Sequence, residues 1–154
     1  MTNIRRAIFP YDTALVLSIW REFIANSPVN LDYQNNEVEF GNLAAKYAPG
    51  TGCVLLADRG GEIEGCIAFR RVSSEICEMK RLYVRPHARG SKLGHQLVEK
   101  LIGEARAMGY REMRLDVQEK FISARKLYAA LGFVPAEPVS FNPVPGASFL
   151  GRYL

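Results

Sequence analysis

The segment from Cys77 to Met108 has the residue types and spacing of a phosphate-binding turn. Its first residues predict a strand, Arg89 and Gly90 predict a tight turn, and the periodic apolar residues that follow predict a helix. The first N–H groups of a helix have no acceptors within the helix, and the aligned peptide dipoles place partial positive charge there. A phosphate or pyrophosphate group satisfies both. The segment therefore predicts an anion site at the start of this helix.

Positive charge is concentrated around the same turn. Residues 70–92 include seven Lys or Arg and two Asp or Glu, an excess of five, whereas the whole chain has a net charge of only +4. The rest of the chain therefore sums to −1. Such a cluster could be a solvated face, a nucleic-acid site or a site for the phosphates of a small cofactor. The cations gather at one turn without interleaved exposed aromatic residues, so we favour the cofactor and expect no nucleic-acid partner.

The six residues Arg89–Gly94 match a known signature in part. They resemble the phosphate-binding motif of the GNAT superfamily of acyl-CoA-dependent N-acyltransferases, Arg/Gln-x-x-Gly-x-Gly/Ala, at the first and last positions. Lys92 stands where the middle glycine is usual. Glycine there lets the backbone approach the pyrophosphate closely. Lysine keeps the backbone N–H and adds an ammonium group, so the turn can still bind phosphate.

Two further segments extend the resemblance over roughly residues 54–133. Leu82–Val84 precedes the turn at the spacing of the superfamily's pantetheine-binding strand, and Ala124–Phe133 resembles its motif B. The resemblance implies that acetyl-CoA is the cosubstrate. The residues that it implies bind acetyl-CoA are Leu82, Tyr83, Val84, Arg89, Gly90, Ser91, Lys92, Leu93, Gly94, His95, Ser123 and Lys126.

Glu78 is the candidate for the base that the implied reaction needs. An amine with a pKa near 10 is only ~0.1% neutral at pH 7, a handicap of roughly 4 kcal/mol. Glu78 lies six residues before Val84, which matches the catalytic glutamate of those superfamily members that use one. Desolvation would raise the pKa of its carboxyl group, and a water could relay the proton. The alternative is an ion pair with Lys80 or Arg81, and we weigh the two equally.

Tyr128 is the candidate for the acid. A phenol with a pKa near 10 is protonated at pH 7 and can donate to a departing thiolate. The resemblance implies that Tyr128 faces the sulfur of CoA; the alternative is an aromatic ring that only fills space between helix and sheet. Many relatives have an asparagine where this chain has Phe121. The hydrogen bond that this asparagine makes to the cofactor would then be missing here or supplied by Ser123.

The acceptor is expected to be a primary amine that attacks the thioester directly in a ternary complex. No cysteine is placed to carry the acyl group, because Cys77 should point to the strand face opposite Glu78. A small-molecule amine or amino acid is the first choice. A protein N-terminus or lysine is the alternative substrate, and a non-catalytic module that senses CoA or binds a partner is the alternative class. The acceptor pocket is expected between Ser27–Gln34 and Phe141–Gly146.

The elements that must position these residues predict one α/β domain over residues 1–154. The order βααβββαβαββ predicts the GNAT fold, a mixed twisted sheet of about seven strands with about four helices on both faces. A bulge near Leu82 should help two strands splay beside the turn. The predicted strands are 3–9, 53–58, 63–72, 75–84, 111–117, 133–139 and 148–154, and the predicted helices are 12–25, 36–47, 91–108 and 123–131.

Composition limits the other classes of function. At 154 residues with 48% apolar content, the chain can form one hydrophobic core. Two histidines and three cysteines without metal-ligand spacing argue against a metal site. We find no membrane-length apolar run and no secretory pattern near Met1, and we expect a cytoplasmic protein. The resemblance also implies that a homodimer could form.

Overall fold

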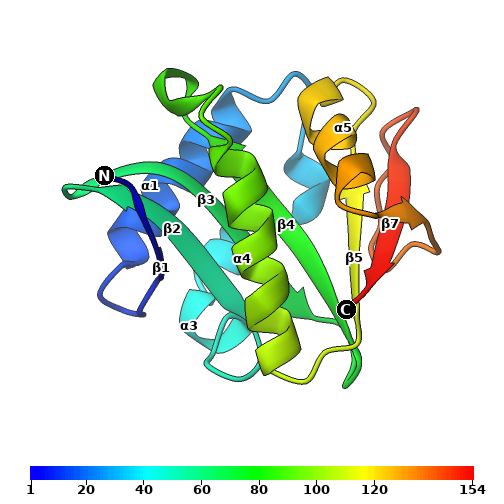
Figure 1. The fold of residues 1–154 in the computed structure, drawn as a ribbon, viewed down its shortest axis with the longest axis horizontal. Helices are drawn as coiled ribbons and strands as arrows, with labels where there is room; N and C mark the ends of the chain where they lie inside the picture. The colour runs from blue at the N-terminus through cyan, green and yellow to red at the C-terminus, as the bar shows by residue number, and fades with distance from the viewer.

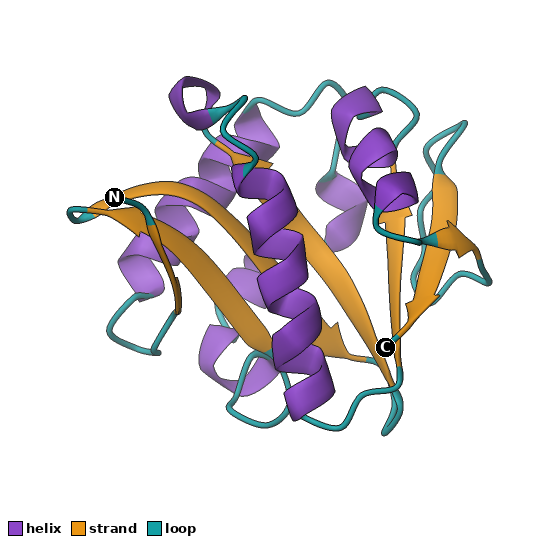
Figure 2. Ribbon diagram, viewed as in Figure 1, coloured by secondary structure: helices purple, strands orange, loops and turns teal.

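The computed structural model describes residues 1–154 as one mixed sheet with helices on both faces (Figures 1 and 2). Seven strands lie in the order β1-β2-β3-β4-β5-β7-β6, which confirms the predicted fold class. The strands are β1 (Asn3–Arg6), β2 (Cys53–Arg59), β3 (Glu62–Arg71), β4 (Ile76–Val84), β5 (Glu112–Val117), β6 (Val134–Pro135) and β7 (Ser148–Tyr153). The helices are α1 (Thr13–Ala25), α2 (Asn36–Phe40), α3 (Leu43–Lys46), α4 (Leu93–Ala107) and α5 (Ile122–Ala130), with single 3₁₀ turns η1 (Asp32–Gln34) and η2 (Pro86–Ala88).

Two apolar clusters hold the helices against the sheet. On one face, α4 and α5 pack on strand residues such as Leu55, Phe69 and Met79. On the other face, α1, α2 and α3 pack around Trp20 and Phe40. Figure 1 shows α4 crossing the near face of the sheet and α1 lying behind it. The alternation of side chains along each strand supplies both clusters, because successive residues point to opposite faces.

The sheet opens where β4 passes β5. These strands form the one parallel pair, and they pair only from Ile76 to Glu78 on β4. Between Lys80 and Tyr83, β4 also has one residue more than its other neighbour, β3. This bulge contains Arg81, whose φ is 65°, and Leu82, as predicted. Beyond Glu78, the last two thirds of β4 are therefore unpaired on the β5 side.

Three elements differ from the sequence-based expectation. The first strand, predicted over residues 3–9, ends at Arg6. The predicted helix 36–47 is two short helices, because the chain turns at Gly41 and Asn42, where Asn42 has a φ of −140°. The predicted strand 133–139 is reduced to two residues. Pro135 and Pro138 lack the N–H groups that a longer ladder would need. No helix is long and apolar enough to cross a lipid bilayer.

Candidate active site

The start of α4 presents a row of free backbone donors. None of the six N–H groups from Gly90 to His95 donates a hydrogen bond within the chain. Gly90 and Lys92 have φ values of 83° and 63°. With these left-handed residues, the N–H groups of the turn and those of the first helical turn face the same side. Successive N–H groups in such a turn form a concave anion site. The geometry matches a pyrophosphate site, as the sequence predicts.

A cleft of about 660 Å³ opens beside this turn. The end of β4, the start of α4 and the start of α5 form its walls. Ten of the predicted cofactor residues line it: Leu82, Tyr83, Val84, Arg89, Gly90, Lys92, Leu93, Gly94, His95 and Ser123. Ser91 does not line the cleft; its hydroxyl donates to the carbonyl of Ala88, which holds the turn. The cleft therefore gathers most of the predicted set around one elongated space.

This cleft, called the cofactor cleft below after the predicted residues that line it, also contains residues outside the predicted binding set. Lys120 and Phe121 line it between β5 and α5. Ser27 and Pro28, expected in the acceptor pocket, line the cofactor cleft instead, because α1 ends beside the bulge of β4. Lys120 adds a cation to the cleft. It meets the other lining residues only through the tertiary fold, so no local sequence pattern indicates this position.

Arg89 and Tyr83 form one side of the cleft. The Arg89 side chain donates to the carbonyl of Val84 at 2.9 Å, and its guanidinium carbon lies 5.9 Å from the centre of the Tyr83 ring. The Tyr83 hydroxyl donates to Glu22 at 2.8 Å. Tyr83 is therefore fixed at both its ring and its hydroxyl, and it packs on Phe23 of α1.

A second, polar pocket of about 270 Å³ lies along the same strand. Only two of its ten lining residues, Tyr33 and Phe141, are apolar, and their rings meet edge to face at 6.5 Å. The others are Gln34, Asn35, Lys46, Arg70, Glu78, Lys80, Asp116 and Ser140. Residues from both predicted acceptor segments, Ser27–Gln34 and Phe141–Gly146, therefore meet here, next to the charged faces of β4 and β5.

Glu78 is buried in this polar pocket, with 3% of its surface exposed. Both carboxylate oxygens are engaged: Arg70 donates to Oε1 at 2.7 Å and Ser140 donates to Oε2 at 2.7 Å. An ion pair was the alternative role for Glu78, and its partner is Arg70 rather than Lys80 or Arg81. Cys77 points to the opposite face and is fully buried, as expected for a residue that carries no acyl group.

Asp116 is a second carboxylate in the polar pocket. Asn142 donates to its Oδ2 at 2.8 Å, and no other residue donates to its Oδ1. The pKa of the Asp116 carboxyl group is raised above its usual value. Burial is the largest cause and the charge of nearby Glu78 adds to it, while the hydrogen bond from Asn142 opposes them. Asp116 lies two residues beyond the last pair of β4 and β5, at the splay. No sequence motif points to Asp116, although the alternation of residues 111–117 puts it on the face of Arg114 and away from the core.

Tyr128 is 94% buried on α5, next to Phe133. Burial raises the pKa of its phenol, and the Asp116 carboxylate raises it further. The hydroxyl makes no hydrogen bond within the chain, so its proton is available to a ligand. Tyr128 does not line the cofactor cleft directly. It is near enough to Asp116 for the negative charge there to raise the pKa of the phenol.

Comparison with known proteins settles the family. The family model described as the acetyltransferase (GNAT) family matches residues 15–133. An uncharacterised N-acetyltransferase of Schizosaccharomyces pombe is 38% identical over 132 residues, which cover 84% of this chain and 81% of the relative. This chain belongs to the GNAT family. The assignment confirms the acyl-CoA-dependent N-acetyltransferase class that the sequence predicted.

Three further proteins are similar to this chain, one in sequence and two in fold. An IAA acetyltransferase of Azospirillum brasilense is 33% identical over 65% of this chain and 67% of its own length. Among solved structures, a GNAT acetyltransferase from Staphylococcus aureus has a TM-score of 0.82 at 22% identity and covers 99% of both chains. A Salmonella typhimurium acetyltransferase solved with its cofactor acetyl-CoA has a TM-score of 0.72 at 22% identity, over 99% of this chain and 94% of its own.

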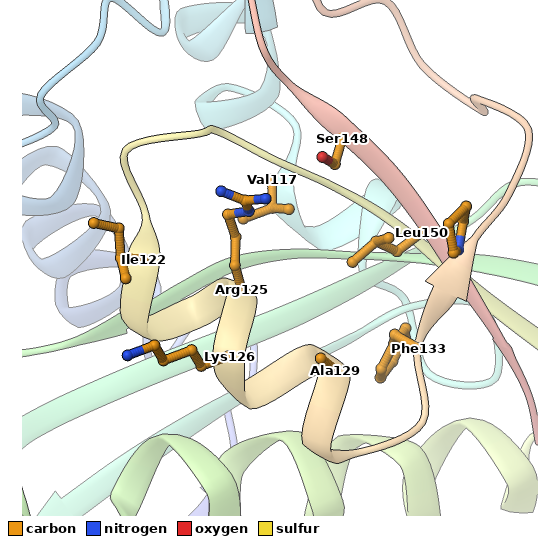
Figure 3. Close-up of a pocket in the computed structure, with 9 residues that line it drawn as sticks. Val117, Ile122, Arg125, Lys126, Ala129, Phe133, Ser148 and Leu150 are labelled. Carbon is orange, nitrogen blue, oxygen red and sulfur yellow. The ribbon is translucent and has the colours of Figure 1, made fainter.

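Lys126 is the predicted cofactor residue that the GNAT fold places farthest from expectation. It lies on α5 at a separate groove of about 440 Å³, shown in Figure 3. Ser148 and Leu150 of β7 form the opposite wall of this groove. Leu127 and Ser123, on the other side of α5, line the cofactor cleft. Its contact with CoA stays a prediction and has no part in the site built above.

Proposed function

We propose that this chain transfers the acetyl group of acetyl-CoA to the primary amine of a small molecule by direct attack. The observation that carries the proposal is the row of six free N–H groups, Gly90 to His95, at one end of a cleft that runs to the splay of β4 and β5. Phosphate oxygens fit the donors, and an extended chain fits beside an unpaired strand.

The residues of the GNAT site suit acetyl-CoA. The turn from Gly90 to His95 would hold the pyrophosphate, with Lys92 as an added cation. The part of β4 that is unpaired on its β5 side, from Met79 to Val84, would hydrogen-bond the pantetheine arm as a neighbouring strand does. When bound, acetyl-CoA supplies an activated acetyl group as a thioester. The chain's own residues then orient this group toward the polar pocket, which lies along the same strand.

Tyr128 is proposed to protonate the departing sulfur. Burial keeps its phenol protonated across the physiological range, because its pKa is raised further above its usual value of about 10. Two carboxylates, Glu78 and Asp116, are candidates to receive the proton that the amine gives up. Both line the polar pocket. Direct attack needs no acyl-enzyme, and the three cysteines are buried with raised thiol pKa values.

The size of the polar pocket favours a small acceptor. Its volume of about 270 Å³ is below the ~300 Å³ at which ordinary ligand pockets begin. The rings of Tyr33 and Phe141 line it and contact each other, which leaves less room for a folded protein chain. A small amine can enter such a pocket more readily than a lysine on a protein surface.

Acetyl transfer to a panel of amines tests the proposal. The purified chain is incubated with acetyl-CoA and amino acids, arylamines, polyamines or lysine peptides, and released CoA thiol is measured. Mass spectrometry should find a product heavier by one acetyl group for a small amine. Thiol release only by hydrolysis, or acetylation confined to the peptides, would contradict the proposal.

A further inference from the structure

We infer that the acceptor is an amine that also carries a carboxylate, an amino acid, and that Asp116 receives the proton from its nitrogen. This inference rests on the proposed acetyl transfer and adds the substrate class and the base. It follows from the charged groups of the polar pocket: Arg70 and Glu78 pair with each other, which leaves two ammonium groups and one carboxylate to face a ligand.

The ammonium groups belong to Lys46 and Lys80. Both contact the same oxygen of buried Glu39, Oε1, at 2.9 and 3.2 Å, so the two nitrogens are held close together. The other oxygen of Glu39 is taken by Arg81 at 3.1 Å. Lys46 donates one of its three N–H bonds to Glu39, and Lys80 forms an ion pair with the same oxygen. Both ammonium groups keep further N–H bonds for the polar pocket that both side chains line.

Arg70 is less available to the acceptor, because three of its five N–H bonds are already used within the chain. Its guanidinium already donates to Glu78 and to the carbonyl oxygens of Arg71 and Val139. A pair of adjacent ammonium groups beside a small pocket attracts a carboxylate and repels a second cation. A polyamine would therefore bind poorly here, whereas the carboxylate of an amino acid would be paired.

Asp116 is better placed than Glu78 to receive the amine. Glu78 has donors on both oxygens, Arg70 on one and Ser140 on the other. Asn142 is the one other residue that donates to Asp116, and no other residue donates to its Oδ1. An incoming ammonium group needs a free acceptor, so the nitrogen should lie against Asp116 while the carboxylate lies against Lys46 and Lys80. Both ends of an amino acid are then satisfied.

The proposed transfer conserves protons and electron pairs at the reacting atoms. The substrate ammonium gives one proton to Asp116, which releases it to solvent through the open pocket. The nitrogen lone pair forms the new bond to the acetyl carbon, and the bond between that carbon and sulfur breaks. The nitrogen loses its second proton by the same route. Tyr128 donates a proton to the leaving sulfur and regains one from solvent, so one proton is released per ammonium consumed.

Other ionisable groups share the space around Asp116 and belong in the account of its pH dependence. Glu78 and Lys80 lie on the neighbouring strand, and the Tyr33 and Tyr128 phenols feel the charge of Asp116. Arg70 and Lys46 complete the lining. Asp116 combines a carboxyl pKa that burial raises with an Oδ1 to which no other residue donates.

The experiment compares amino acids with their amides, which keep the amine and replace the carboxylate by a neutral group. With saturating acetyl-CoA, kcat/KM for the preferred amino acid should exceed that of its amide by at least about 10-fold. In the Lys46→Met/Lys80→Met variant this preference should fall to near one, through a higher KM for the amino acid. Lys100→Met, which removes an exposed lysine on α4, should keep it. If the double variant melts early, Lys46→Met alone should halve the preference or more.

The base is tested by pH profiles. Asp116→Asn should lower kcat about 10²-fold or more and remove the acidic limb of kcat/KM, whereas Glu78→Gln should keep that limb. Equal use of amino acid and amide, or a limb that disappears in Glu78→Gln and persists in Asp116→Asn, would overturn the inference but not the acetyl transfer. Failure to acetylate any amine in the panel would overturn both.

Discussion

Arg70 and Glu78 face each other across neighbouring strands, with the Arg70 Nε 2.7 Å from Glu78 Oε1. We propose that this contact, together with the hydrogen bond from Ser140, gives Glu78 a structural role in the wall of the polar pocket. Glu78→Gln should therefore lower kcat less than 10-fold. Glutamine can still accept from Arg70 but loses the charge, so about 1 kcal/mol of stability should be lost, or roughly 2–4 °C in melting temperature. Turnover and thermal melting measure both; a loss of 10³-fold in kcat would make Glu78 the base.

Tyr128→Phe should lower kcat by about 10²-fold and leave the affinity for acetyl-CoA nearly unchanged. A general acid acts in the transition state and adds little to ground-state binding. Because the hydroxyl makes no hydrogen bond within the chain and Phe fills the same space beside Phe133, the melting temperature should change little. Steady-state kinetics and equilibrium binding give the two numbers. Normal turnover would assign Tyr128 to packing alone.

Glu39 should be the carboxylate on which stability depends most. It contacts Lys46, Lys80 and Arg81, and these cations hold its pKa at about 2 although burial opposes them. The unfolded value is ~4.3. The folded pKa is the lower one, so the stabilisation is complete above about pH 4.3 and is lost as the pH falls toward 2.

Glu39→Gln removes this charge and leaves Lys80 and Arg81 without their carboxylate. We expect a loss of about 3–5 kcal/mol at pH 7, or roughly 6–20 °C in melting temperature. The exposed Glu99→Gln on α4 serves as the matched control and should change the melting temperature by little. A Glu39→Gln variant as stable as the parent chain would show that the buried cations are satisfied without this carboxylate.

The cofactor half of the site could be predicted from sequence because its signals are local. Arg89, Gly90 and Gly94 lie within six residues, and the bulge near Leu82 lies on the same strand. The acceptor half could not, because Lys46, Lys80 and Asp116 come from three elements that meet only in the folded sheet. In the sequence alone, these three charged residues look like ordinary solvent-exposed side chains. Burial and the missing second donor on Asp116 appear only in three dimensions.

Lys92→Gly should restore the usual motif at little net cost. Lys92 has a φ of 63°, a left-handed conformation that costs a non-glycine residue roughly 1–2 kcal/mol. Glycine removes this strain but adds roughly 0.5–1 kcal/mol of unfolded-state entropy. The melting temperature should therefore stay within a few degrees, and acetyl-CoA should still bind. Loss of binding in Lys92→Gly would mean that the ammonium group is essential to the phosphate site.

The most direct test of the account is the effect of acetyl-CoA on thermal unfolding. If the turn from Gly90 to His95 binds its pyrophosphate, acetyl-CoA at about 100 times its Kd should add about 2.7 kcal/mol, or roughly 5–10 °C in melting temperature. ADP should give a smaller shift. Lys92→Glu should lose most of the shift, and Lys100→Glu on the exposed face of α4 should keep it. A folded sample whose melting temperature does not respond to saturating acetyl-CoA would contradict the cofactor site and the acetyl transfer built on it.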